Sequence, residues 1–152
     1  MEIQIRKNSK KTQLNKHWQY CVGSGHAPLA LRADYLRQLK QVHEELGIQR
    51  VRFHGIFNDD MQVVMKYSDL MPLPGAEKLV QVSFRKIGMV YDNILACGMK
   101  PYVELSFMPK HLASSDAKCA FYYGGCIAPP RDDEEWIGFI KKFVTYLIDR
   151  YG

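Results

Sequence analysis

Apolar residues recur every three or four positions in three stretches of the chain, a spacing typical of amphipathic helices. Helices are therefore predicted over residues 34–46, over about 77–97, and from 132 or 133 to 151. An aspartate caps the first and the third, and a glycine follows each of the three. The predicted apolar faces are Leu36, Leu39, Val42 and Leu46; Val80, Phe84, Ile87, Tyr91, Ile94 and Leu95; and Trp136, Phe139, Ile140, Phe143, Leu147 and Tyr151.

Short apolar runs before these helices predict strands. The first run spans residues 17–22 and leads into a glycine-bearing loop at 23–26; the others span 48–57 and 101–107. The G-x-G of the loop lacks both the third glycine of a dinucleotide fingerprint and the Gly-Lys-Ser/Thr of a P-loop. No nucleotide site or other cofactor is therefore expected.

A strand, a long loop and a helix thus follow one another three times. Alternation of this kind favours a parallel α/β sheet. The loops after strands are long, as at 58–76 and 108–131, whereas the loops after helices are very short. This asymmetry is typical of a (β/α)₈ TIM-type barrel, whose active site is built from the loops after the strands. A doubly wound sheet produces the same local pattern.

Two segments are predicted. Residues 1–16 hold a short alternating strand and a polar loop, and are expected to belong to an accessory β element. Residues 17–152 hold the first three βα units of a barrel, which needs roughly 200–250 residues to close. Such a piece leaves sheet edges unpaired, so the remainder of the barrel or a second copy is expected to cover them.

Composition removes several classes of function. No apolar run is long enough to span a bilayer, and the first residues do not read as a signal peptide, so a cytoplasmic protein without a membrane partner is expected. The cysteines have no paired metal-ligand spacing, so thiols and no metal are expected. The net charge of +5 is concentrated in residues 6–16, with no nucleic-acid motif, so no nucleic-acid partner is expected.

Several segments together resemble glycoside hydrolase family 39. They come in the order of that family, and the resemblance covers residues from about 17 to 152. The segments are 18–26, 50–57, 102–110, 121–123 with Pro129-Pro130, and 150–152.

The resemblance implies a retaining β-xylosidase-like hydrolase that removes terminal β-linked xylose from xylo-oligosaccharides. The family also includes enzymes that act on uronic acids. Its acid/base glutamate is expected in an Asn-Glu-Pro motif after the fourth barrel strand, and its nucleophile near the end of the seventh. Retention needs both carboxyl groups, about 5–5.5 Å apart. This chain contains neither strand and no Asn-Glu pair, so no catalytic residue is assigned and the chain is expected to be inactive alone.

Candidate substrate-binding residues lie at the ends of the predicted strands. Arg52 and His54 alternate with apolar neighbours and match an Arg-x-His pattern of the family, although a solvent-facing sheet edge gives the same alternation. Phe107 is expected as an apolar wall against the sugar ring, or as core. His26 is expected to line the same cleft. Glu104 is expected to form a structural ion pair with Arg52, because a buried carboxylate needs a partner.

Three further residues in the third strand-following loop complete the prediction. They are expected to line the cleft or to contact a second sugar, and they are Lys110, Tyr122 and Tyr123. The alternative hypothesis is a small α/β module that uses its aromatic loops to bind carbohydrate or protein. The two hypotheses differ in whether the chain needs further barrel units.

Overall fold

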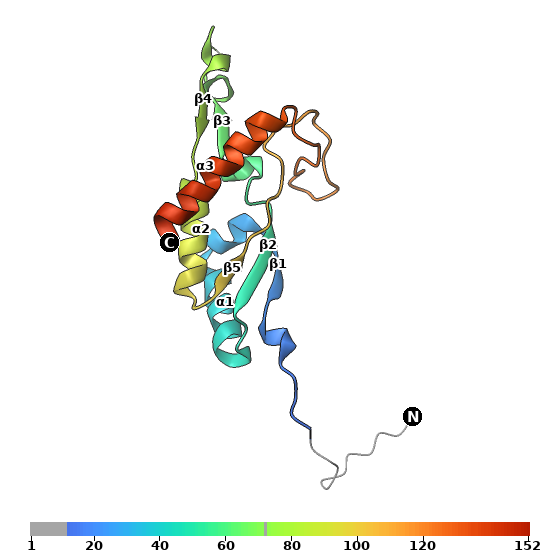
Figure 1. The fold of residues 1–152 in the computed structure, drawn as a ribbon, viewed down its shortest axis with the longest axis vertical. Helices are drawn as coiled ribbons and strands as arrows, with labels where there is room; N and C mark the ends of the chain where they lie inside the picture. Colours follow the sequence, from blue (N-terminus) through green and yellow to red (C-terminus); the bar gives the residue numbers. More distant parts are fainter. Residues whose placement is uncertain (1–11, 72) are drawn as a thin grey trace, which may run out of the picture.

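Three parallel strands form the main sheet, and a helix follows each of them in the chain (Figure 1). The computed structural model describes residues 12–71 and 73–152, so the strand predicted within residues 1–16 lies outside the described part. The strands are β1 (Val22–His26), β2 (Arg50–His54) and β5 (Lys100–Tyr102), in the order β1-β2-β5. The helices are α1 (Ala33–Leu46), α2 (Arg85–Ala96) and α3 (Asp133–Tyr151). The predicted succession of parallel βα units is confirmed.

Several short elements join these units. An antiparallel hairpin of β3 (Val64–Lys66) and β4 (Val80–Val82) connects β2 to α2 and extends away from the sheet (Figure 1). A 3₁₀ turn at His17–Gln19 precedes β1. Within the described residues, the connections contain further 3₁₀ turns at Ala27–Leu31, Asp59–Met61, Tyr67–Asp69 and Ala76–Lys78. Among the helices that the structure describes, none is long and apolar enough to cross a bilayer.

The hairpin corrects two predictions. Residues 58–76 are not simply a loop, and the second helix begins at Arg85 instead of about Glu77. Val80 and Phe84 are four positions apart, which imitates helical spacing, but Val80 and Val82 form an exposed strand. Two β-branched residues at a spacing of two favour this extended pairing with β3.

Two predicted strands are displaced. The first was predicted over residues 17–22, yet 17–19 form a 3₁₀ turn and the strand occupies 22–26, including the supposed loop. A larger residue is disfavoured at Gly25 because a Cβ there would lie 2.9 Å from the Leu29 side chain. The third strand was predicted over 101–107, but β5 spans only Lys100–Tyr102, and the residues after it leave the sheet.

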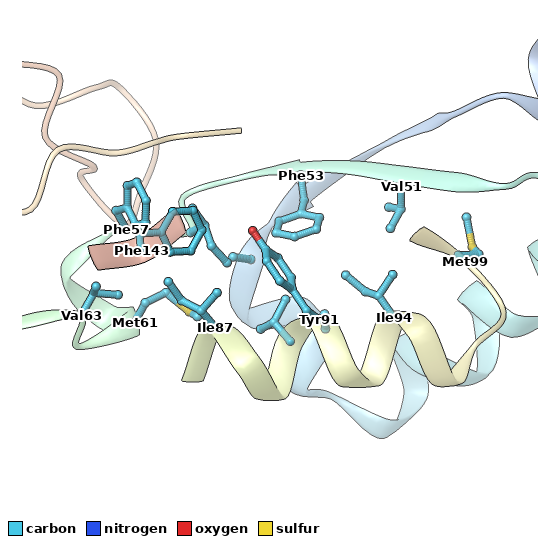
Figure 2. Close-up of a cluster of buried hydrophobic side chains, with 14 of the residues drawn as sticks. Val51, Phe53, Phe57, Met61, Val63, Ile87, Tyr91, Ile94, Met99 and Phe143 are labelled. Atoms are coloured by element: carbon cyan, nitrogen blue, oxygen red, sulfur yellow. The ribbon is translucent and has the colours of Figure 1, made fainter. Parts of the chain in front are cut away.

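The core lies between the sheet and α2. Val51 and Phe53 project from β2 toward α2, where Tyr91 and Ile94 meet them (Figure 2). The rings of Phe53 and Tyr91 are 6.2 Å apart and nearly edge to face. The predicted alternation of buried Val51 and Phe53 with more exposed Arg52 and His54 is confirmed. The polar face of β2 is thus left available on the side away from α2.

Helix α3 is held by an aromatic cluster. Phe143 is buried, and its ring lies 4.9 Å from that of Phe57 and 5.4 Å from that of Phe84. The side chain of Asp132 caps the helix by accepting from the backbone N–H of Glu135 at 2.7 Å, as predicted.

The predicted helix faces need small corrections. Leu46, Leu95 and Tyr151 were expected inward but are exposed. Each lies in the final turn of its helix. Asp34 is not the cap of α1 but lies in its first turn, where its carboxylate pairs with the preceding Arg32 at 2.7 Å.

Candidate substrate-binding site

The carboxyl ends of β1 and β2 bring two histidines together. His26 is the last residue of β1 and His54 the last of β2, and the two are partners in the parallel register. Their rings are stacked with centroids 5.9 Å apart. His26 is buried and His54 is half-buried. Both therefore lie at the edge of the sheet where strand-following loops converge, away from α1 and α2.

Aromatic rings from the segment after β5 surround His54. Phe121 stacks on it at 5.5 Å, and Phe107 meets it edge to face at 6.0 Å. Tyr123 lies parallel to it at 5.8 Å, and the Tyr123 hydroxyl is hydrogen-bonded to Nε2 of His54. We refer to His26, His54, Phe107, Phe121 and Tyr123 as the histidine–aromatic cluster.

His26 is the buried imidazole of this cluster. Its ring is stacked on that of Tyr123 at a centroid separation of 3.9 Å. Its Nε2 has no hydrogen-bond partner within the usual range, and the nearest charge is Oδ2 of Asp60 at 3.5 Å. Burial lowers the pKa of His26, the Asp60 carboxylate opposes this shift, and His54 adds to it. The imidazole is therefore kept neutral over a wider pH range than in water.

Glycines leave the space that these rings occupy. Gly55 has a φ of 78°, and a Cβ there would lie 2.5 Å from the His26 ring. A Cβ on Gly125 would lie 2.2 Å from Cδ2 of Phe107. Since real Cβ atoms do not approach so closely, both glycines are required by the packing of the cluster.

Arg52 and Glu104 form an ion pair beside the cluster. A guanidinium nitrogen of Arg52 lies 2.8 Å from a carboxylate oxygen of Glu104. The other oxygen accepts from the Ser106 hydroxyl at 3.1 Å, and that hydroxyl accepts from the Gly55 N–H at 3.1 Å. The expected partner of Glu104 is thus found. Because Arg52 is well exposed, the pair contributes less than about 1 kcal/mol and serves chiefly to orient both groups.

The predicted residues separate into two groups. His26, His54 and Phe107 meet in the cluster, and Arg52 emerges from the same face of β2. Lys110 does not join them, because its ammonium pairs with Asp69 of the hairpin connection at 3.4 Å. Tyr122 is almost wholly exposed, whereas its neighbour Tyr123 is half-buried and stacked on His26.

Three residues near the cluster were not anticipated there. Phe121 was named only within a resembling segment, and Ser106 and Asp60 were not among the candidate residues. Asp60 accepts from the Asn58 amide at 3.0 Å while its other oxygen faces His26. The run Phe121-Tyr122-Tyr123 before two glycines was the available signal for the first of them.

The arrangement suits binding more than bond cleavage. The cluster offers ring faces, which suit contact with an apolar surface, and imidazole nitrogens, which suit hydrogen bonding to hydroxyl groups. Glu104 and Asp60, the carboxylates beside it, are already engaged by neighbouring groups. Within residues 12–71 and 73–152, no group of three or more His, Cys, Asp or Glu side chains is placed to hold a metal ion.

Three parallel strands, each followed by a helix, define an α/β type of protein. The sequence profile of glycosyl hydrolases family 39 matches residues 1–152. The chain belongs to glycosyl hydrolase family 39, as the resemblance implied.

Relatives agree with this assignment. The chain is 44% identical over 152 residues to a beta-xylosidase of Caldicellulosiruptor saccharolyticus, covering all of this chain and 29% of the relative. It is 35% identical over 150 residues to a beta-xylosidase of Geobacillus stearothermophilus, covering 99% of this chain and 28% of the relative. The chain thus spans less than a third of the length of these relatives.

Solved structures share the fold. A GH39 beta-xylosidase from Caulobacter crescentus superposes with a TM-score of 0.76 at 34% identity, covering 88% of this chain and 28% of that one. A GH39 enzyme from Xanthomonas axonopodis pv. citri gives a TM-score of 0.74 at 29% identity, covering 88% and 24%. The parallel units of this chain therefore correspond to the N-terminal part of a (β/α)₈ barrel.

Proposed function

We propose that this chain is the substrate-binding N-terminal part of a retaining β-xylosidase, which removes terminal β-linked xylose from xylo-oligosaccharides. The observation that carries the proposal is the histidine–aromatic cluster at the strand ends of a family 39 chain. The acid/base and nucleophile glutamates belong to barrel strands beyond residue 152, so the chain alone is inactive.

Each residue has a role in this proposal. The imidazole of His54 hydrogen-bonds a sugar hydroxyl, and the ring of Phe107 forms an apolar wall for the pyranose. Arg52, oriented by Glu104, is available to a hydroxyl or to an incoming catalytic carboxylate. His26 supports the cluster from below. No cofactor enters this scheme.

Further parts of the proposal concern the surroundings of the site. Residues 1–16 belong to an accessory β element, and residues 17–152 to the barrel. The edge strands β1 and β5 are covered by the remaining barrel units or by a second copy. The protein works in the cytoplasm.

The test compares residues 1–152 with an extended chain. The extended chain joins residues 1–152 to the part of the Caldicellulosiruptor saccharolyticus beta-xylosidase that follows its matched segment. Release of the aryl group from an aryl β-xyloside and an aryl β-glucuronide is then followed. We expect the extended chain to cleave the xyloside in preference, and residues 1–152 to cleave neither. Turnover by residues 1–152 alone would place a catalytic carboxylate, Glu104 first, within this chain.

Substitution of His54 makes the test specific. His54→Ala in the extended chain should lower kcat/KM for the xyloside by about ten-fold or more, since a hydrogen bond to a sugar hydroxyl is lost. His17→Ala is the matched control, because His17 lies exposed in the turn before β1. Equal activity of the two variants would remove His54 from the site.

A binding module remains the second candidate, favoured by the exposure of Tyr122 and Phe121 on the outside of the cluster. Exposed rings of this kind can stack on a sugar. Calorimetric titration of residues 1–152 with xylo-oligosaccharides distinguishes the candidates. Tight binding by these residues alone would support the module.

A further inference from the structure

Tyr123 makes two contacts that fix its ring and its hydroxyl separately. The ring is stacked on that of His26 at a centroid distance of 3.9 Å and an interplanar angle of 11°. The hydroxyl reaches Nε2 of His54, which belongs to the neighbouring strand. Tyr123 therefore links the last residues of β1 and β2.

The direction of the hydrogen bond follows from the partners that each group has. Among the described residues, Nε2 of His54 is the one hydrogen-bond partner of the Tyr123 hydroxyl. A phenol has a single proton to donate, so donation to Nε2 satisfies it, whereas the reverse direction leaves that proton without an acceptor in the protein. Burial raises the pKa of the Tyr123 hydroxyl, with smaller effects of Cys119 and Tyr122, so the hydroxyl retains its proton.

The direction determines what His54 can offer to a ligand. A neutral imidazole carries its proton on one nitrogen, and the other accepts. With Nε2 occupied as acceptor, the proton resides on Nδ1, for which the described residues provide no hydrogen-bond partner. Phe121 and Phe107 pack on the same ring and restrict its rotation.

We propose that Tyr123 is a positioning residue, which donates to Nε2 of His54 and holds the imidazole as the Nδ1–H tautomer, so that His54 is a hydrogen-bond donor to an oxygen of the bound sugar. The inference rests on the proposed function of His54 as a sugar-binding residue. Tyr123 was predicted to contact a second sugar. In this proposal it orients His54 instead.

The first test uses Tyr123→Phe in the extended chain, because this change removes the hydroxyl and keeps the ring on His26. We expect kcat/KM for the aryl β-xyloside to fall about ten-fold, as for loss of one orienting hydrogen bond. Tyr67→Phe is the matched control, because Tyr67 is exposed on the hairpin connection. Thermal unfolding of both variants should be unchanged, which separates positioning from folding.

The second test asks whether Tyr123 acts through His54. In the His54→Ala background, Tyr123→Phe should change kcat/KM by less than about two-fold, because the group it orients is absent. An undiminished ten-fold effect in that background would overturn the proposal, since Tyr123 would then act on the ligand independently. Unchanged activity of the single variant would also overturn it.

The third test does not depend on activity. Long-range ¹H–¹⁵N correlation of ¹⁵N-histidine in the extended chain distinguishes Nδ1–H from Nε2–H, with the His54 signals assigned by their loss in His54→Gln. We expect one tautomer, Nδ1–H, in the parent and a mixture in Tyr123→Phe. The same tautomer in both proteins would overturn the inference. A tautomer that responds as expected in a chain without xyloside hydrolysis would instead contradict the proposed function alone.

Discussion

The ring of Phe107 occupies the space that a side chain at position 125 would need. Gly125→Ala places a Cβ only 2.2 Å from Cδ2 of Phe107, too close for two carbon atoms that are not bonded. Either the ring or the loop must move. We expect a loss of about 1–3 kcal/mol in the free energy of unfolding of the extended chain, together with a higher KM for the xyloside.

Two controls locate this effect. Gly23→Ala adds a methyl group on β1 with nothing within 4 Å, so its cost should be small. In a Phe107→Ala background, Gly125→Ala should lose most of its cost because the obstructing ring is gone. Urea denaturation of the parent and of these four variants, the double variant included, gives the comparison. Equal costs with and without the Phe107 ring would show that the clash is not the cause.

His26 gives the folded chain a pH dependence. Its pKa is lowered in the folded state, chiefly by burial, so the unfolded chain binds a proton at higher pH than the folded one. Above a pH of about 6.5, the imidazole is neutral in both states, and the folded chain loses no stability through it. As the pH falls below this value, the unfolded chain binds the proton more readily, and the free energy of unfolding decreases. We expect the Tm of the extended chain to fall between about pH 7 and pH 5, and to fall less in His26→Gln.

Asp60 opposes the shift at His26, which provides a companion measurement. Asp60→Asn removes the carboxylate that favours the imidazolium, so the pKa of His26 should fall further and the loss of Tm toward acid pH should deepen. A shallower dependence in Asp60→Asn than in the parent would mean that another group controls this pH range.

At the scale of elements, the hairpin is tied to the body of the molecule through Asp69. Its carboxylate accepts from Nε2 of His111 at 2.6 Å and lies 3.4 Å from Nζ of Lys110. The His111 hydrogen bond is the main reason that the pKa of Asp69 is lowered. Asp69→Asn should therefore speed amide hydrogen exchange of β3 and β4 with little change in Tm. Asp116→Asn, which makes the same change at an exposed loop carboxylate, is the control.

Phe143 is the most deeply buried ring of helix α3. Phe143→Ala removes contacts to Phe57 and Phe84 and should lower the free energy of unfolding by about 3–5 kcal/mol. The adjacent Val144 is 46% exposed, so Val144→Ala should cost much less. Chemical denaturation of both variants measures the difference, and similar costs would mean that α3 does not pack as observed.

Elements were predicted well where the apolar residues followed a single spacing, either helical or extended. In α3, apolar residues recur at helical spacing throughout and Asp132 is a strong cap, so its bounds were correct. The strand β4 was missed because Val80 also fits the apolar face of α2, and only pairing with β3 distinguishes the two. Pairing with β2 likewise places glycine-rich residues 22–26 in a strand, which local propensity disfavours.

The site was partly predictable for a related reason. Arg52 and His54 were identified because alternation along a strand decides which face a side chain occupies. The positions of Phe121 and Tyr123 depend on how a long connection folds back, with Met108 N–H donating to Cys126 C=O at 3.0 Å. Such tertiary contacts leave no periodic signal in the sequence. Lys110 was predicted to line the cleft because it follows the third strand. That position does not show whether its side chain lies near the histidines or near the hairpin, where it pairs with Asp69.

For the whole molecule, the unpaired edge strands are the feature most able to cause association with another chain. The strands β1 and β5 each have one unpaired side in the described chain. Beside β5 lies an open groove of about 380 Å³, whose lining includes Tyr91, Val103 and Leu147. We expect residues 1–152 alone to associate or to unfold without a sharp transition, as measured by sedimentation and near-ultraviolet circular dichroism. The extended chain, in which we propose that the remaining barrel units cover these surfaces, should show one cooperative transition. A monomeric short chain that unfolds cooperatively would contradict this expectation.

The histidine–aromatic cluster divides its members between two kinds of backbone. His26 and His54 stand on paired strands, whereas Phe107, Phe121 and Tyr123 come from the irregular segment after β5. Substitutions in residues 119–122 can therefore change the surroundings of His54 while the sheet keeps its register. In design terms, the two kinds of backbone can be varied separately. A mutant library confined to residues 119–122 of the extended chain should accordingly yield folded variants, and under the proposed function their sugar preference should change.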